Sequence, residues 1–187
     1  MLWLLLILFL SACIPVRDEI LLSHDDWRGT TTVTVNEREV FRSDDGNGLM
    51  TARPVITRGP DGRAFGVLLN VRRRDANGPR IDRVTSGRKV LTYTAHDRLL
   101  THCIDGCQPA EVGVITLTET AFHIAAQSGL PLRVWGQRGR YEGTVPAEAF
   151  LRVLVAANAA PNHAAAQPLS GANTGAGQLG DRDMPKP

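Results

Sequence analysis

Residues 51–72 read TARPVITRGPDGRAFGVLLNVR, and they hold two strand-like runs on either side of one turn signal. The runs are Thr51–Arg58 and Ala64–Arg72, and Gly59-Pro60-Asp61-Gly62 lies between them. Glycine and proline supply the backbone angles that a tight turn needs. This stretch therefore predicts an antiparallel hairpin.

Further short strands separated by turns are expected on both sides of this hairpin. In chain order they are Thr30–Val35, Val40–Phe41 as the continuation of a hairpin, Arg80–Thr85, Lys89–Thr94, Glu111–Leu117, Pro131–Trp135 and Arg140–Val145. Strands with this spacing are typical of an antiparallel sandwich or a partly open barrel.

Two short helices are expected near the C-terminal end of the domain. Thr116-Leu117-Thr118-Glu119 fits a capping box, in which a Thr oxygen and a Glu carboxylate satisfy free amides at a helix start. That helix should stop at Gly129, which tolerates the left-handed conformation. Pro146 suits the first position of a second helix, whose face towards the sheet would hold Ala147, Phe150, Leu151 and Leu154. The predicted fold class is α+β, mainly β.

The first ten residues, MLWLLLILFL, carry no polar or charged side chain. A membrane-spanning helix needs about 20 apolar residues, so the run fits the apolar core of a secretory signal instead. Leu10-Ser11-Ala12-Cys13 resembles the lipobox of bacterial lipoproteins, which implies cleavage before Cys13 and lipid on its thiol. The run departs from the usual signal because no Lys or Arg opens it. The alternative is a buried first strand with Cys13 as a core thiol.

The chain divides into four expected segments. Residues 1–12 form the signal peptide, 13–18 a short tether, 19–156 a single β-rich domain, and 157–187 a disordered tail rich in Ala, Gly, Pro and Asn. Lipid on Cys13 would hold the domain to a membrane of the bacterial cell envelope. Ile14, rather than Asp, follows the cysteine, and by resemblance to enteric lipoproteins this favours the outer membrane.

Cys103 and Cys107 are the other cysteines, and Asp105-Gly106 lies between them. An exported protein meets an oxidising compartment, so a structural disulfide is expected. The Asp-Gly pair permits the tight turn that brings the sulfurs together. Two alternatives stay open: a redox-active dithiol, whose usual motif has two intervening residues, and a metal site with His102 and with His96, Asp97 or Glu111.

Several other patterns are weaker. The Asp44–Gly48 run has oxygens for calcium but lacks the EF-hand spacing, so a solvated turn is expected. His24-Asp25-Asp26 and His96-Asp97 each place a base beside a carboxylate, but adjacent side chains on a strand point to opposite faces. Arg72–Arg74 could meet lipid phosphates, and a solvated hairpin end is preferred. The core or the rim of the sheet is the expected place of Trp27 and Trp135.

One long stretch carries a set of short motifs. A cysteine pair with Gly before the second cysteine is followed by Ala110-Glu111-Val112, a strand, a helix, two strands and a Pro-led segment around Phe150; Asp26-Trp27-Arg28 stands near the mature start. This stretch, from Cys103 to Leu154, is similar to the invasion-associated locus B family of exported bacterial proteins. It departs from the family because no further cysteine follows the Trp, and because residues 145–150 replace a Ser-Leu-x-Gly-Phe segment. The resemblance implies a β-rich, non-enzymatic envelope protein and transfers no catalytic residue.

Together these patterns favour a lipid-anchored, non-enzymatic envelope module that binds another envelope protein or peptidoglycan. The formal net charge of +2 on 187 residues does not indicate nucleic acid as a partner. No cofactor, metal or catalytic residue is assigned. The alternative is a small envelope hydrolase or metal-dependent enzyme that uses His96, Asp97 and the Cys103–Cys107 loop. A third option is a carrier for a small apolar ligand inside the sheet.

Overall fold

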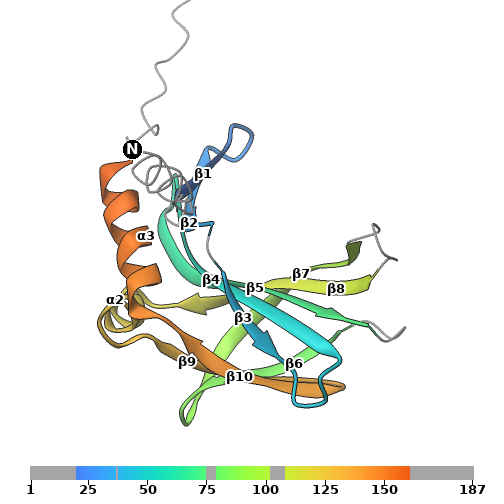
Figure 1. Ribbon diagram of the computed structural model, residues 1–187. Coiled ribbons are helices and arrows are strands. Elements are labelled where there is room, and N and C mark those ends of the chain that lie inside the picture. Colours follow the sequence, from blue (N-terminus) through green and yellow to red (C-terminus); the bar gives the residue numbers. More distant parts are fainter. Residues whose placement is uncertain (1–19, 37, 75–78, 102–107, 161–187) are drawn as a thin grey trace, which may run out of the picture.

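A computed structural model describes residues 20–36, 38–74, 79–101 and 108–160 (Figure 1). The elements, in chain order, are β1 (Ile20–Asp25), β2 (Thr30–Val35), β3 (Glu39–Arg42), β4 (Gly48–Gly59), β5 (Gly62–Arg73), β6 (Ile81–Ser86), β7 (Lys89–Thr101), β8 (Gln108–Leu117), α2 (Glu119–Ser128), β9 (Leu130–Gly136), β10 (Gly139–Val145) and α3 (Ala147–Ala159). Ten antiparallel strands form one open sheet, and both helices lie in the C-terminal part of the domain, which confirms the predicted fold class. None of the helices in these ranges is both long and apolar enough to cross a membrane.

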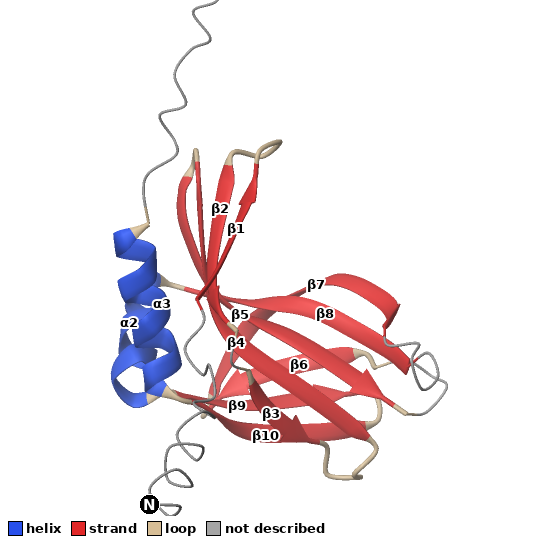
Figure 2. Ribbon diagram, turned by 45° about the horizontal axis from the view of Figure 1, so that its top comes forward, coloured by secondary structure: helices blue, strands red, loops and turns tan. Residues whose placement is uncertain are grey.

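The sheet is curled, and two of its strands, β4 and β7, change partners along their length. The strand order is β1-β2-β4-β5-β8-β7-β6-β9-β10, and β3 pairs with the first part of β4. Strand β7 pairs first with β6 and then with β8, and its register shifts between Ala95 and Asp97. The far strand β10 then meets the end of β3 through a bridge between Ser43 and Tyr141. The result is a partly open barrel, with a seam between β3 and β10 (Figure 2).

The inside of the curl is filled by apolar side chains from alternate strand positions. Val67 and Leu69 of β5 and Ile115 of β8 are 0% exposed, and they share this inner face. The helices close one end of the curl (Figure 2). Phe122 of α2 packs against Phe65 of β5 at 5.4 Å and against Phe150 of α3 at 4.9 Å between ring centroids. Because aromatic rings bury large apolar areas, this trio fixes the helix pair to the sheet.

The hairpin predicted around Gly59–Gly62 is confirmed, since β4 and β5 pair along their whole length. Two neighbouring strands differ from the prediction. Val40–Phe41 lies in β3, which pairs with β4 instead of continuing the strand at Thr30–Val35. Strand β1 was not predicted, and it pairs with β2 over all six residues. From Leu22 onward its side chains are all exposed, so β1 has no alternation of buried and exposed residues that its sequence could reveal.

The helices follow the prediction with two corrections. The cap of α2 is Thr118 rather than Thr116, because the Thr118 hydroxyl accepts a hydrogen bond from the Ala121 amide. Gly129 ends α2 with φ at 76°, as predicted. In α3, Leu151 is exposed; the buried face consists of Ala149, Phe150, Val153, Leu154 and Ala157. This helix ends at Ala159.

Candidate functional site

The predicted lipidation site, Cys13, and the predicted disulfide pair, Cys103 and Cys107, lie outside the described residues. The strands on either side of the cysteine pair are described, and β7 and β8 are paired up to Thr101 opposite Gln108. Lipidation and the disulfide therefore stay predictions.

The two candidate enzyme residues whose side chains the structure describes, His96 and Glu111, do not come together. His96 is exposed at the register shift of β7, whereas Glu111 of β8 is fully buried. His102 and the side chain of Asp97 lie outside what the structure describes. Within the described ranges, no group of three His, Cys, Asp or Glu side chains could hold a metal ion. These positions give no support to a metal-dependent or hydrolytic site.

Arg73, at the end of β5, is only 3% exposed and spans the seam between β3 and β10. Its Nη2 donates a hydrogen bond to Asp45 Oδ2 at 2.5 Å, and its Nη1 donates to the carbonyl of Arg138 in the β9–β10 turn. The Asp45 carboxylate also accepts from the Ser43 hydroxyl and the Asn47 amide. The hydrogen bond from Arg73, more than the other two, holds the pKa of Asp45 well below its usual range. We call Arg73, Asp45 and Arg138 the seam clasp.

The seam clasp changes the interpretation of two sequence patterns. The solvated hairpin end predicted at Arg72–Arg74 is wrong for Arg73, which is buried. The Asp44–Gly48 run is a turn, as predicted, but its carboxylates bind the protein itself. Asp44 Oδ1 accepts a hydrogen bond from the Arg140 amide at 2.8 Å, across the same seam. The acidic run therefore helps to close the barrel.

Glu111 is a carboxylate buried inside the curl, with 0% of its surface exposed. It accepts hydrogen bonds from the Tyr93 hydroxyl at 3.0 Å and from the Ile81 amide at 3.3 Å. The Tyr93 ring lies directly over Gly113, where a Cβ atom would overlap it. A buried carboxylate is stable only with such donors, because burial without a hydrogen bond is unfavourable. These contacts tie β8 to β7 and to β6, which is a structural role.

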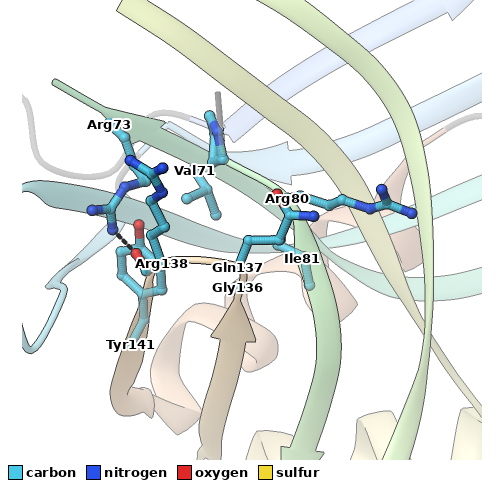
Figure 3. A pocket seen from close by; sticks show the side chains of 9 residues that line it. Val71, Arg73, Arg80, Ile81, Gly136, Gln137, Arg138 and Tyr141 are labelled. Atoms are coloured by element: carbon cyan, nitrogen blue, oxygen red, sulfur yellow. Dashed lines mark hydrogen bonds between the residues drawn. The ribbon is translucent and has the colours of Figure 1, made fainter. Parts of the chain in front are cut away.

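A small cavity lies between Arg73 and the start of β6 (Figure 3). Val71, Ile81 and Tyr141 are among the residues that line it. The cavity measures about 10 Å³, which is room for about one water molecule. Figure 3 shows Arg73 turned towards the Arg138 carbonyl and Arg80 pointing away from both. Among the described residues, the buried charged group Arg73 thus lines a cavity with room for about one water molecule.

The outer surface of β6, β9 and β10 carries an exposed row of arginines around one tryptophan. The register places Arg83 of β6 and Arg140 of β10 on either side of Trp135 of β9. Arg83 Cζ lies 4.2 Å from the Trp135 ring centroid, which is a cation–π contact. Arg133 Cζ lies 5.9 Å from the same ring. We call Arg83, Arg133, Trp135 and Arg140 the arginine–tryptophan face.

The strands that form this face have an excess of positive charge. Residues 80–89 and 130–145 contain seven Arg or Lys and two Asp or Glu, and all of these side chains are exposed. Their net charge is +5, whereas the whole chain has +2, so the rest of the chain is negative overall. A cationic surface of this kind attracts anionic partners over several ångströms.

A hollow of about 220 Å³ adjoins the arginine–tryptophan face. Gly87, Pro131, Arg133, Glu142 and Thr144 are among its lining residues. Arg133 Nε and Nη2 donate to the two Glu142 carboxylate oxygens at 3.1 and 2.7 Å. This pairing lowers the pKa of Glu142 and raises that of Arg133, so both side chains stay charged around neutral pH. The hollow therefore offers hydrogen-bond donors and acceptors side by side.

The sequence contained part of the signal for this face. Residues Arg133 and Trp135, and likewise Arg140 and Glu142, alternate in a predicted hairpin, so each pair shares one side of its strand. The position of Arg83 depends on the pairing of β6 with β9, which no turn signal specifies.

Trp27 is 95% exposed in the turn between β1 and β2, so its predicted place in the core or at the rim is wrong. Asp25 Oδ1 accepts hydrogen bonds from the amides of Trp27 and Arg28, which fixes this turn. His24 Nε2 lies 3.2 Å from Asp26 Oδ1, and both side chains are exposed. These residues form a solvent-exposed turn, in contrast to Trp135, which is partly buried as expected of a residue at the rim.

No protein-family model matches the chain, and neither the curated proteins nor the solved structures contain a match. The resemblance to the invasion-associated locus B family therefore stays a prediction.

Proposed function

We propose that the chain is a lipid-anchored protein of the bacterial cell envelope, favoured at the outer membrane, whose barrel binds an anionic envelope component without catalysing a reaction. The observation that supports binding is the exposed arginine–tryptophan face, in which Trp135 lies between Arg83 and Arg140. Arginine and tryptophan are the residue types that contribute most often to binding hot spots. Arginine also recognises carboxylates and phosphates through paired hydrogen bonds.

The buried polar groups support a non-enzymatic role. Arg73 and Glu111 bind neighbouring strands, and the cavity beside Arg73 has room for about one water molecule. The curl interior holds packed side chains such as Leu69, Ile115 and Val134, all 0% exposed, which gives a carrier of apolar ligands no support.

The anchor is tested with the full chain expressed in a bacterial host. The wild type should be found in the membrane fraction, with the mass of a diacylglyceryl group on Cys13. The Cys13→Ala chain should lack this mass and leave the membrane fraction. An unmodified wild-type Cys13 would overturn the lipoprotein part of the proposal.

Binding through the face is tested by elution from a carboxylate resin. The Arg83→Glu/Arg140→Glu chain should elute at much lower salt than the wild type. A control pair, Arg28→Glu/Arg63→Glu, has the same charge change at exposed sites away from the face. Equal shifts for both pairs would show that only net charge matters, and would contradict a binding role of the face.

A further inference from the structure

We infer that the hollow beside Arg133 is a saccharide subsite, and that the anionic partner of the arginine–tryptophan face is peptidoglycan. This inference rests on the proposed function, because it names the partner of the same surface. The inference is supported by two neighbouring surfaces with different chemistry. In the hollow, the charges of Arg133 and Glu142 balance each other, and the row beside it is cationic.

The hollow is suited to the hydroxyl and amide groups of a sugar. A guanidinium has five N–H donors, and Arg133 uses Nε and Nη2 to bind Glu142. Among the described residues nothing is bonded to Arg133 Nη1, so this nitrogen can donate to a ligand. The Glu142 oxygens keep further lone pairs to accept from a hydroxyl, and the Thr144 hydroxyl can do either. Glu142 would repel a carboxylate or phosphate inside the hollow, so a neutral polar ring is the group that fits there.

The cationic row is suited to a carboxylate next to that ring. Arg83 and Arg140 belong to the row that contains Trp135, and Arg133 belongs to the adjacent row of the same face. Arg133 Cζ lies 5.9 Å from the Trp135 ring, so the hollow and the row are in contact. Peptidoglycan has the matching arrangement, because acidic peptide stems branch from its sugar chain. A flat lipid surface would engage the row but would leave the hollow unused.

The hollow is tested with a residue that fills it. In the Thr144→Phe chain, a ring on the exposed face of β10 would occupy the hollow; Thr116→Phe is the matched control, because Thr116 is an exposed threonine on the outer side of β8. The assay measures co-sedimentation of the full Cys13→Ala chain with protein-free sacculi. Thr144→Phe should weaken binding about tenfold, the loss that 1.4 kcal/mol represents, and Thr116→Phe should bind as the parent does. Equal binding of the two variants would overturn the saccharide subsite.

The role of the carboxylates is tested on the same sacculi. Amidation of the peptide carboxylates should weaken binding about tenfold, and Arg83→Glu/Arg140→Glu should weaken binding to untreated sacculi to the same degree. The other source of anionic groups is a membrane, and vesicles of phosphatidylglycerol are the probe for it. Stronger binding to these vesicles than to sacculi would overturn the peptidoglycan inference while the proposed function stands. If the charge reversals affect neither sacculi nor the carboxylate resin, the proposed function itself is wrong.

Discussion

Arg73 donates a hydrogen bond to the carboxylate of Asp45, which lies 28 residues earlier in the chain, and so links β5 to the turn between β3 and β4. The same guanidinium donates to the Arg138 carbonyl on the other side of the seam. One buried side chain thus binds both borders of the opening in the barrel.

The seam clasp should make stability depend on pH. The pKa of Asp45 is depressed in the folded chain, so the carboxylate stabilises the fold above its ordinary pKa of 3.8 and loses this effect as pH falls towards the folded value. Asp45→Asn should therefore lower the melting temperature at pH 7, and its difference from the wild type should shrink below pH 3.8. Asp61→Asn makes the same charge change on an exposed turn and serves as control. A difference that stays constant with pH would contradict an ionic clasp.

Glu111 is predicted to stabilise the fold through its hydrogen bonds. Glu111→Ala removes the acceptor of the Tyr93 hydroxyl and of the buried Ile81 amide. A buried amide without an acceptor costs about 1–3 kcal/mol of unfolding free energy. Glu111→Gln keeps a carbonyl oxygen in the same place and should lose less. Urea denaturation of both variants measures the difference. Equal losses would mean that the carboxylate has another role.

Gly48 is predicted to tolerate no side chain, because a Cβ atom there would overlap the Tyr141 hydroxyl. Gly48→Ala should destabilise the fold by about 1–3 kcal/mol, as overpacking of a core usually does. Tyr141→Phe removes the overlapping oxygen, although the ring carbon at 2.9 Å remains. The double variant should therefore recover part of the loss. If the two losses simply add, the contact is not the cause.

Cys103 and Cys107 are predicted to form a disulfide in protein taken from the envelope. The intact mass should be lower by two hydrogen atoms than that of the reduced chain, and neither thiol should react with an alkylating agent before reduction. Replacing both cysteines by serine should cost roughly 2 kcal/mol in the chain-entropy model. Two alkylated thiols in unreduced protein would rule the disulfide out.

The predicted elements follow from local chemistry. The Gly59–Gly62 turn and the Gly129 helix stop depend on backbone angles that glycine and proline supply, and both are confirmed. The fold class is confirmed for the same reason, because most strands are bordered by such turns. Strand β1 has no alternating pattern of burial and was therefore not predicted; it is paired with β2 over its whole length.

The candidate sites depend on contacts between segments that are distant in the sequence. Sequence patterns predict such contacts less well than they predict local turns and helix ends. Burial of Arg73 follows from the curl of the sheet, which brings Arg138 and Asp45 within reach. Trp27 is exposed in a turn whose amides donate hydrogen bonds to Asp25, although a tryptophan is usually expected inside. The arginine–tryptophan face required the register of β6 against β9.

The seam also determines the order in which the chain can fold. Asp44 and Arg140, which meet across it, are 96 residues apart, and closing a loop of that length loses more chain entropy than forming a hairpin does. Hairpins such as β3–β4 and β4–β5 can form as soon as their residues are available, whereas the other edge of β3 can meet β10 only after β10 has been made. Synthesis proceeds from the N-terminus, so this edge of β3 stays without its partner until β10 has been made. The last hairpin to be made, β9–β10, is therefore the one that brings the two borders of the partly open barrel together.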